Sequence, residues 1–247
     1  MLIRARALTK TYSAGANRVN AVKAVDLDIA AGDYVAIMGP SGSGKSSLLH
    51  LLGLLDQPTS GALEIEGESV AAATPERRAE LRNRRVGFVF QSYNLLPRST
   101  AIENVELPLI YSGLRAVERR PLAEAALARV GLTARRNHWP AQLSGGEQQR
   151  VAIARAIVAG PALVLADEPT GALDSRTGED ILALFGELNS SGCAVILVTH
   201  DMQIARNARR ILVFGDGELL GEKSLATAEG ATPAPANETP SDTGQVL

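Results

Sequence analysis

Residues 39–46 are Gly-Pro-Ser-Gly-Ser-Gly-Lys-Ser, and they follow directly on the short apolar run Tyr34–Met38. This pattern has the fixed glycines, lysine and serine of a phosphate-binding loop, and a leucine-rich helical pattern continues from Lys45. The glycines let successive backbone N–H groups turn toward one centre, and the positive end of the helix attracts an anion. The sequence therefore predicts a strand, a phosphate-binding loop and a helix. A simple glycine turn before a helix is the alternative.

The side chains of this loop indicate a magnesium nucleotide, with ATP as the expected ligand. We expect Lys45 to neutralise the β and γ phosphates and Ser46 to bind Mg²⁺. The residues expected to bind the nucleotide here are Gly39, Pro40, Ser41, Gly42, Ser43, Gly44, Lys45, Ser46 and Ser47.

Two adjacent acids, Asp167 and Glu168, follow the apolar run Leu163–Ala166. In an open α/β sheet, the carboxyl end of a core parallel strand lies where ligands bind. We therefore expect Asp167 to hold Mg²⁺, directly or through a water, and Glu168 to orient and polarise an attacking water. Solvated turn carboxylates would produce the same pattern, and only the phosphate-binding loop favours the catalytic roles.

A second glycine-rich segment, Leu-Ser-Gly-Gly-Glu at 143–147, precedes a helical pattern that runs to Val158. A serine and two glycines at a helix start make a second anion-binding N-terminus. The alternative is ordinary capping, with Ser144 as the N-cap and Glu147 completing a capping box. The segment alone does not decide between these alternatives.

The order of the remaining patterns predicts an α/β fold with a P-loop NTPase core. Continuous apolar runs alternate with helical patterns and indicate a mostly parallel sheet covered on both faces, with 211–214 as the last strand. The alternation at 22–29 indicates an antiparallel β edge subdomain. Residues of about 95–150 are interpreted as a helical subdomain insertion, with a helix at 121–130 and loops at Pro97, Pro108 and Pro140.

Composition restricts the domain organisation and the partners. One domain is expected over 1–225, and the Ala-, Thr- and Pro-rich residues 226–247 are expected to form a disordered tail. The net charge of −2 indicates no broad basic face, so no nucleic acid is expected as a partner. The single cysteine excludes an internal disulfide. No secretory signal is visible and the apolar runs are too short to cross a bilayer, so another chain would have to provide any membrane-spanning part.

With these motifs in this order, the chain resembles the nucleotide-binding subunits of ATP-binding-cassette (ABC) transporters over residues 1 to about 222. In that family the segment 143–147 is the signature. The resemblance implies that it contacts the γ-phosphate of a nucleotide held by a second copy in a head-to-tail dimer. The residues concerned are Ser144, Gly145, Gly146 and Glu147. The physics agrees, because a two-fold dimer lets each nucleotide receive one helix end from each copy.

The resemblance also gives roles to residues whose patterns are weak alone. Tyr12 stands where an aromatic ring stacks on adenine, and this placement depends on the loop at 15–19. Gln91 stands where a glutamine contacts Mg²⁺ and the attacking water, Asp174 where a loop crosses the dimer seam, and His200 where a histidine holds the γ-phosphate. Each residue type is also common in purely structural positions. The implied catalytic residues are Glu168, His200, Gln91 and Lys45, and the implied magnesium ligands are Ser46, Gln91 and Asp167.

Stretches at 51–56, 87–96, 103–108 and 166–174 resemble the macrolide-exporter and lipoprotein-releasing branch of the family (MacB-like and LolD-like subunits). This resemblance implies a peripheral ATPase on the cytoplasmic face of the inner (plasma) membrane, which drives a separate transmembrane permease subunit by ATP-dependent dimer closure. Tyr93, Leu95 and Leu96 are our candidate for the groove that holds a cytoplasmic helix of that partner. Ordinary packing of the helical insertion is the alternative for this segment.

Two other functions would use a similar cassette. An ATPase resembling FtsE would transmit force or a signal to a membrane partner without transport. A soluble ABC ATPase would act on DNA or ribosomes, but the sequence shows no long coiled-coil insertion, zinc cysteines or second cassette. Identification of the chain that co-purifies from membranes separates all three. No cassette residue is expected to contact the cargo, so the sequence does not identify it.

Overall fold

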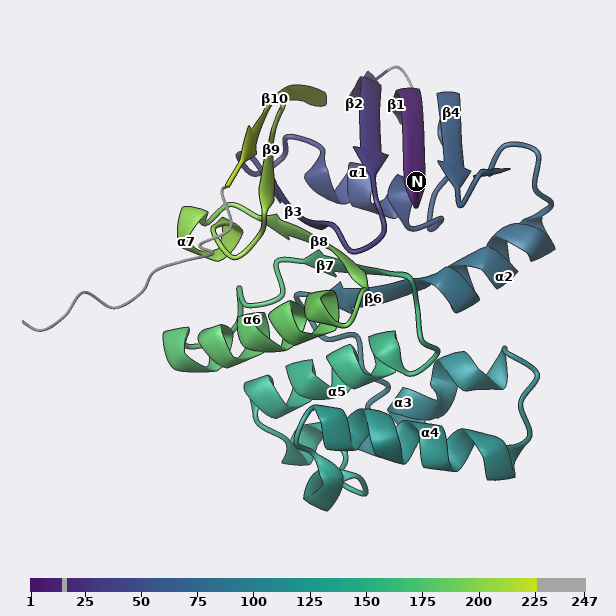
Figure 1. Ribbon diagram of the computed structural model, residues 1–247, viewed down its shortest axis with the longest axis vertical. Helices are drawn as coiled ribbons and strands as arrows, with labels where there is room; N and C mark the ends of the chain where they lie inside the picture. Colours follow the sequence, from purple (N-terminus) through teal and green to yellow (C-terminus); the bar gives the residue numbers. More distant parts are fainter. Residues whose placement is uncertain (15–16, 226–247) are drawn as a thin grey trace, which may run out of the picture.

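The computed structural model describes residues 1–14 and 17–225 (Figure 1). The predicted tail at 226–247 and two residues of the loop beside Tyr12 lie outside the described residues. The strands are β1 (Ile3–Ala14), β2 (Asn17–Ile29), β3 (Tyr34–Met38), β4 (Ser60–Ile65), β5 (Glu68–Ser69), β6 (Val86–Phe90), β7 (Leu163–Asp167), β8 (Ala194–Thr199), β9 (Arg210–Gly215) and β10 (Glu218–Ser224). The helices are α1 (Lys45–Leu52), α2 (Pro75–Arg85), α3 (Ala101–Ile110), α4 (Ala116–Arg129), η1 (Thr133–Arg135), η2 (Pro140–Gln142), α5 (Gly145–Ile157), α6 (Ser175–Ser190) and α7 (Met202–Ala205).

The strands form two sheets. A six-stranded sheet has the order β10-β9-β3-β8-β7-β6, and all of its pairs are parallel except β9 with β10. Every residue of β8 is buried, which agrees with the continuous apolar runs expected of strands covered on both faces. The predicted parallel core is therefore confirmed. The four-stranded sheet, β2-β1-β4-β5, is antiparallel and separate from it.

The six-stranded sheet divides the apolar interior into two cores. Val35 and Ile37 of β3 face a core that contains α1 and the antiparallel sheet, whereas Ala36 between them faces a core that contains helices α3 to α6. This division follows from the alternation of side chains along a strand. In Figure 1 the antiparallel sheet and helices α3, α4 and α5 consequently lie at opposite ends of the molecule. None of the described helices is both long and apolar enough to cross a bilayer.

Three local predictions were wrong or incomplete. The sequence patterns missed β1, which lies between β2 and β4 in the four-stranded sheet, and β10, which pairs with β9 at the edge of the six-stranded sheet. Pro108 lies inside α3 and not in a loop; its missing N–H removes only one bond near the end of this helix. Helix α4 begins before Pro121, at Ala116, because the Glu118 carboxylate accepts the Arg115 N–H at 2.8 Å and caps the first turn.

Candidate functional site

The loop between β3 and α1 has the backbone that a phosphate-binding loop requires. Gly44 is the N-cap of α1 and has a φ of 101°. A Cβ atom at this residue would lie 2.0 Å from the carbonyl oxygen of Ala21, so only glycine fits. The first N–H groups of α1 have no acceptor within the helix and face the loop. This end of α1 therefore provides an anion site.

Two polar side chains of the loop are buried and available to a phosphate. Lys45 is 7% exposed, and its Nζ donates to the carbonyl oxygens of Gly39 at 2.8 Å and Pro40 at 2.7 Å. The hydroxyl of Ser43 is buried, and in the described part of the chain it has no hydrogen-bond partner. Because buried polar groups are normally paired, the unpaired hydroxyl fits a loop that holds phosphate oxygens.

One cavity of about 1330 Å³ brings residues from distant parts of the chain beside this loop. Its volume is ample for a nucleotide. The predicted site residues that line it are Tyr12, Pro40, Ser41, Gly42, Ser43, Gly44, Lys45, Ser46, Ser47, Gln91, Asp167, Glu168 and His200. Arg18, Asn20 and Asp216, which the sequence motifs did not indicate, also line this cavity.

The three predicted magnesium ligands, Ser46, Gln91 and Asp167, line this one cavity. Burial raises the pKa of the Asp167 carboxyl above its ordinary value, and a hydrogen bond from the Ser46 side chain partly opposes the rise. A hydroxyl, an amide oxygen and a carboxylate are the hard donors that Mg²⁺ prefers when phosphates complete its coordination. The donor set therefore fits Mg²⁺ bound together with a nucleotide.

Glu168 and His200 form a pair at the cavity wall. The Nδ1 atom of His200 lies 2.7 Å from Oε1 of Glu168, and the histidine side chain is 70% exposed. The hydrogen bond with Glu168 raises the pKa of His200 above its ordinary value. Two residues that were predicted separately, one to act on water and one to hold a phosphate, are thus in direct contact in this structure.

The segment 143–147 lies outside this cavity. Ser144 is the N-cap of α5; its Oγ accepts the Glu147 N–H at 3.2 Å, and the Glu147 carboxylate accepts the Ser144 N–H at 2.8 Å. The capping box considered from the sequence is therefore present. It leaves the N–H groups of the glycines Gly145 and Gly146 at the open end of the helix. Asp174, which caps α6, also does not line the cavity.

Comparison with known proteins relates this geometry to a family. The family model described as ABC transporter matches residues 22–171. An ABC transporter ATP-binding protein of Thermotoga maritima is 51% identical over 223 residues, which are 90% of this chain and 95% of that protein. The macrolide export ATP-binding/permease protein MacB of Escherichia coli is 47% identical over 221 residues, which are 90% of this chain but only 34% of MacB.

Solved structures agree with the sequence matches. The dimeric, post-hydrolysis structure of the ATP-binding cassette MJ0796 bound to ADP and Pi has a TM-score of 0.84 and 45% identity, and the match covers 90% of this chain and 98% of that chain. The chain belongs to the ABC transporter family. It is an ATP-binding ATPase cassette of that family, and its relatives include MacB-type proteins. The predicted family, fold class and ATPase activity are confirmed.

The cassette also shows contacts that no sequence motif indicated. Arg155 of α5 donates to the backbone oxygens of Tyr93 at 2.8 Å and Asn94 at 2.6 Å. A Cβ atom at Gly145 would lie 2.9 Å from the Tyr93 hydroxyl, so α5 packs closely on the segment after Gln91. The sequence feature that could have indicated these contacts is the single arginine, Arg155, within the apolar pattern 151–157.

Tyr12 donates a hydrogen bond from its hydroxyl to Asp56 at 2.9 Å, and its adenine-stacking role stays a prediction.

A second cavity, of about 980 Å³, is lined by residues of α2, β6, α3 and α5 and differs from the groove predicted at Tyr93, Leu95 and Leu96. None of these three residues lines it, and Leu95 packs against the core of helices α3 to α6. For Leu95 the structure therefore agrees with the alternative, in which this segment packs within the helical insertion. The groove, as this cavity is called below, is lined by residues that include Leu55, Phe88, Phe90, Leu107, Tyr111 and Arg155.

Proposed function

We propose that two copies of this cassette close head to tail over two Mg·ATP, and that each active site is completed by the signature segment of the other copy. One observation carries the proposal: the phosphate-binding loop, Asp167, Glu168 and His200 line one cavity, whereas Ser144 at the second anion-binding helix end lies outside it. A two-fold dimer would bring that helix end to the partner's nucleotide. The dimeric form of the related cassette MJ0796 supports this arrangement.

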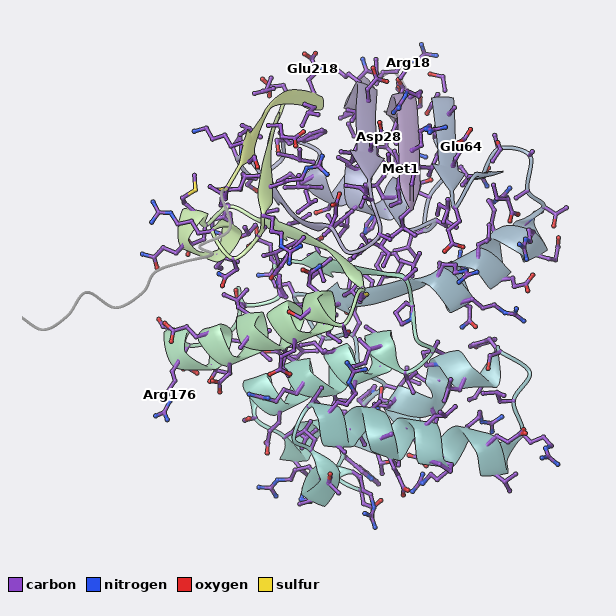
Figure 2. All side chains as sticks on the ribbon, viewed as in Figure 1. Met1, Arg18, Asp28, Glu64, Arg176 and Glu218 are labelled. Atoms are coloured by element: carbon purple, nitrogen blue, oxygen red, sulfur yellow. The ribbon has the colours of Figure 1, made fainter. Side chains whose placement is uncertain are left out.

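Within each site, the residues divide the work. Lys45 and the loop N–H groups would bind the phosphates, while Ser46, Asp167 and Gln91 would hold Mg²⁺, which supplies charge stabilisation at the γ-phosphate. Glu168 would orient the attacking water, and His200, now in contact with Glu168, would turn to the γ-phosphate when it is bound. Asp174 at the start of α6 would cross the seam. Figure 2 shows Arg176 of this same helix end projecting away from the molecule, so the end is open to a second copy.

The same proposal places the cassette at the cytoplasmic face of the inner membrane, where it would drive an exporter through a separate transmembrane permease. The macrolide and pyoverdine relatives, which are named ATP-binding/permease proteins, support the export role. We assign the groove to a cytoplasmic helix of the permease. Strand β6 supports this coupling, because Val86, Phe88 and Phe90 line the groove and the next residue, Gln91, lines the nucleotide cavity. Hydrolysis would remove the γ-phosphate contacts and let the dimer open.

The substitution Glu168→Gln tests the dimer and the catalytic role together. The amide keeps the size of the side chain but polarises water poorly, so ATP should bind and hold a closed dimer while turnover falls about a hundredfold or more. The measurements are ATP turnover and the molar mass in solution with and without ATP. Lys45→Ala is the control, because it should lose ATP binding and remain monomeric.

Either of two results would contradict the proposal. Near-normal turnover in Glu168→Gln would remove Glu168 from the role of water-polarising residue. A variant that binds ATP, does not hydrolyse it and still remains monomeric at high protein concentration would rule out the shared site.

A further inference from the structure

Glu147 places a negative charge at the helix end proposed to face the partner's γ-phosphate. Its carboxylate accepts the Ser144 N–H at 2.8 Å, and this bond is the largest cause that lowers the pKa of Glu147 below its ordinary value. The side chain is therefore ionised at neutral pH. Since a phosphate is also an anion, the Glu147 carboxylate would repel it at the start of α5 and oppose the attraction of the helix end's partial positive charge.

The capping box formed by Ser144 and Glu147 stabilises the first turn of α5, whose free N–H groups are the donors proposed to bind the phosphate. The Glu147 carboxylate accepts the Ser144 N–H, and the Ser144 Oγ accepts the Glu147 N–H. The N–H groups of Gly145 and Gly146 have no acceptor within the helix. The box thus fixes a helix start that presents these two N–H donors, while it adds one unit of negative charge beside them.

Arg135 lies where it can cancel that charge. Its Nε is 3.1 Å from Oε1 of Glu147, the carboxylate oxygen that does not accept the Ser144 N–H. The guanidinium is oriented by η1, on which it lies, and by His138, whose Nε2 is 3.1 Å from Nη1. Arginine keeps its charge at every relevant pH and presents several N–H donors in a planar group. The pair is half-exposed, with 50% of the Arg135 side chain and 27% of the Glu147 side chain accessible.

We propose that Arg135 is a positioning residue of the ATPase site: it neutralises Glu147 so that the start of α5 can accept the γ-phosphate held by a second copy. Arg135 lies outside the nucleotide cavity of its own chain, so it acts on hydrolysis only through the dimer. This inference rests on the proposed head-to-tail dimer. It adds the residue whose positive charge lets the start of α5 bind the partner's phosphate.

The experiment uses the Glu168→Gln chain as the parent, so that ATP hydrolysis does not dissociate the dimer during the measurement. ATP-dependent dimerisation is measured by sedimentation velocity for the parent, for Arg135→Gln and for Arg135→Gln combined with Glu147→Gln. Arg135→Gln should weaken dimerisation about threefold at each site, and so about tenfold for a dimer with two sites. Adding Glu147→Gln should restore it, because the amide removes the charge but its oxygen still accepts the Ser144 N–H.

Arg136→Gln is the matched control. It removes the same charge from the neighbouring residue, which is exposed and makes no side-chain hydrogen bond or ion pair within residues 1–14 and 17–225. Equal dimerisation of Arg135→Gln and Arg136→Gln would overturn the inference, and so would a loss that Glu147→Gln fails to restore, since that would indicate a structural role for Arg135. A parent that never dimerises with ATP would overturn the proposed function and this inference with it, which distinguishes the two failures.

Discussion

Glu168 adopts a left-handed backbone conformation with a φ of 46°. This conformation costs a residue with a Cβ atom roughly 1 kcal/mol, so the surrounding structure must hold it. Two hydrogen bonds do so: the Glu168 N–H donates to Val198 at 3.0 Å, and its carbonyl oxygen accepts the Gly171 N–H at 3.0 Å. The turn brings the carboxylate to His200, and the position of this carboxylate therefore depends on backbone contacts with β8.

The pair predicts a measurable titration of His200. Its pKa is raised above the ordinary value of 6.5, chiefly by the hydrogen bond with Glu168. Because the folded-state pKa is raised, this interaction stabilises the folded chain fully below pH 6.5, and its contribution is lost as the pH rises through the folded pKa. Glu168→Gln should therefore lower the pKa of His200 toward 6.5, measured by NMR on a chain with three histidines. His138 is the internal control, and an unchanged His200 titration would contradict the pairing.

At the scale of elements, the start of α5 packs against the start of α6, and Figure 1 shows these helices side by side. A Cβ atom at Gly146 would lie 2.4 Å from Cγ2 of Thr177. Thr177 is itself held by Asp174, whose carboxylate accepts the Thr177 hydroxyl at 2.7 Å. Gly146 is thus required for packing within one chain, in addition to its proposed contact with a phosphate of the second copy.

Gly146→Ala should therefore destabilise the chain without any nucleotide, by roughly 1–3 kcal/mol, because the added methyl group overpacks this contact. The free energy of unfolding, from urea denaturation, measures the effect. Gly186→Ala in α6 is the control: apart from the backbone of its own helix, no atom lies within 4 Å of its Cβ position, and the change should be neutral or stabilising. Adding Thr177→Ser, which deletes Cγ2 and keeps the hydroxyl, should recover most of the loss. No recovery would show that Thr177 is not the cause.

At the scale of the whole molecule, one sheet connects the two cavities. The nucleotide cavity receives residues from the antiparallel sheet, the phosphate-binding loop and the carboxyl ends of β7 and β8. The groove receives residues from α2, β6, α3 and α5. A ligand at either cavity therefore contacts the same sheet. A displacement of β6 by a partner bound in the groove would be transmitted directly to Gln91, the residue that follows this strand.

If the groove binds the permease, a substitution in it should weaken permease binding without changing the basal ATPase activity. Tyr111 lines the groove and is 80% exposed, so Tyr111→Asp should fold and keep its basal ATPase activity. A carboxylate at this position should weaken permease binding about tenfold or more, because the charge would be buried against the docked helix. Co-purification with the permease and permease-stimulated turnover measure this. Val117→Asp is the control, since Val117 is 72% exposed and lies outside the groove. Equal loss in both variants would rule out the groove as the docking site.

Much of the site could be predicted because its motifs are local. In the phosphate-binding loop, residues 39–46 set their own geometry, and strands β3, β6, β7 and β8 were recognised from continuous apolar runs. Strands β1 and β10 were missed because both mix polar and apolar residues, so neither shows a continuous apolar run. Pro108 misled the helix assignment because the sequence alone does not show that it lies in the last turn of α3.

The sequence by itself determined the phosphate-binding loop, the capping box at Ser144 and Glu147, and the alternation of strands and helices, since each depends on residues within a few positions of one another. Only the tertiary structure decided which of these elements share a cavity. The parallel order of the sheet brings Asp167, Glu168 and His200 to the loop and leaves the start of α5 outside. It also decided that Arg135 contacts Glu147 and that the partly buried Leu95 packs against the helical core. The physical reason is that such contacts join residues far apart along the chain, and their distances follow from how sheets and helices pack.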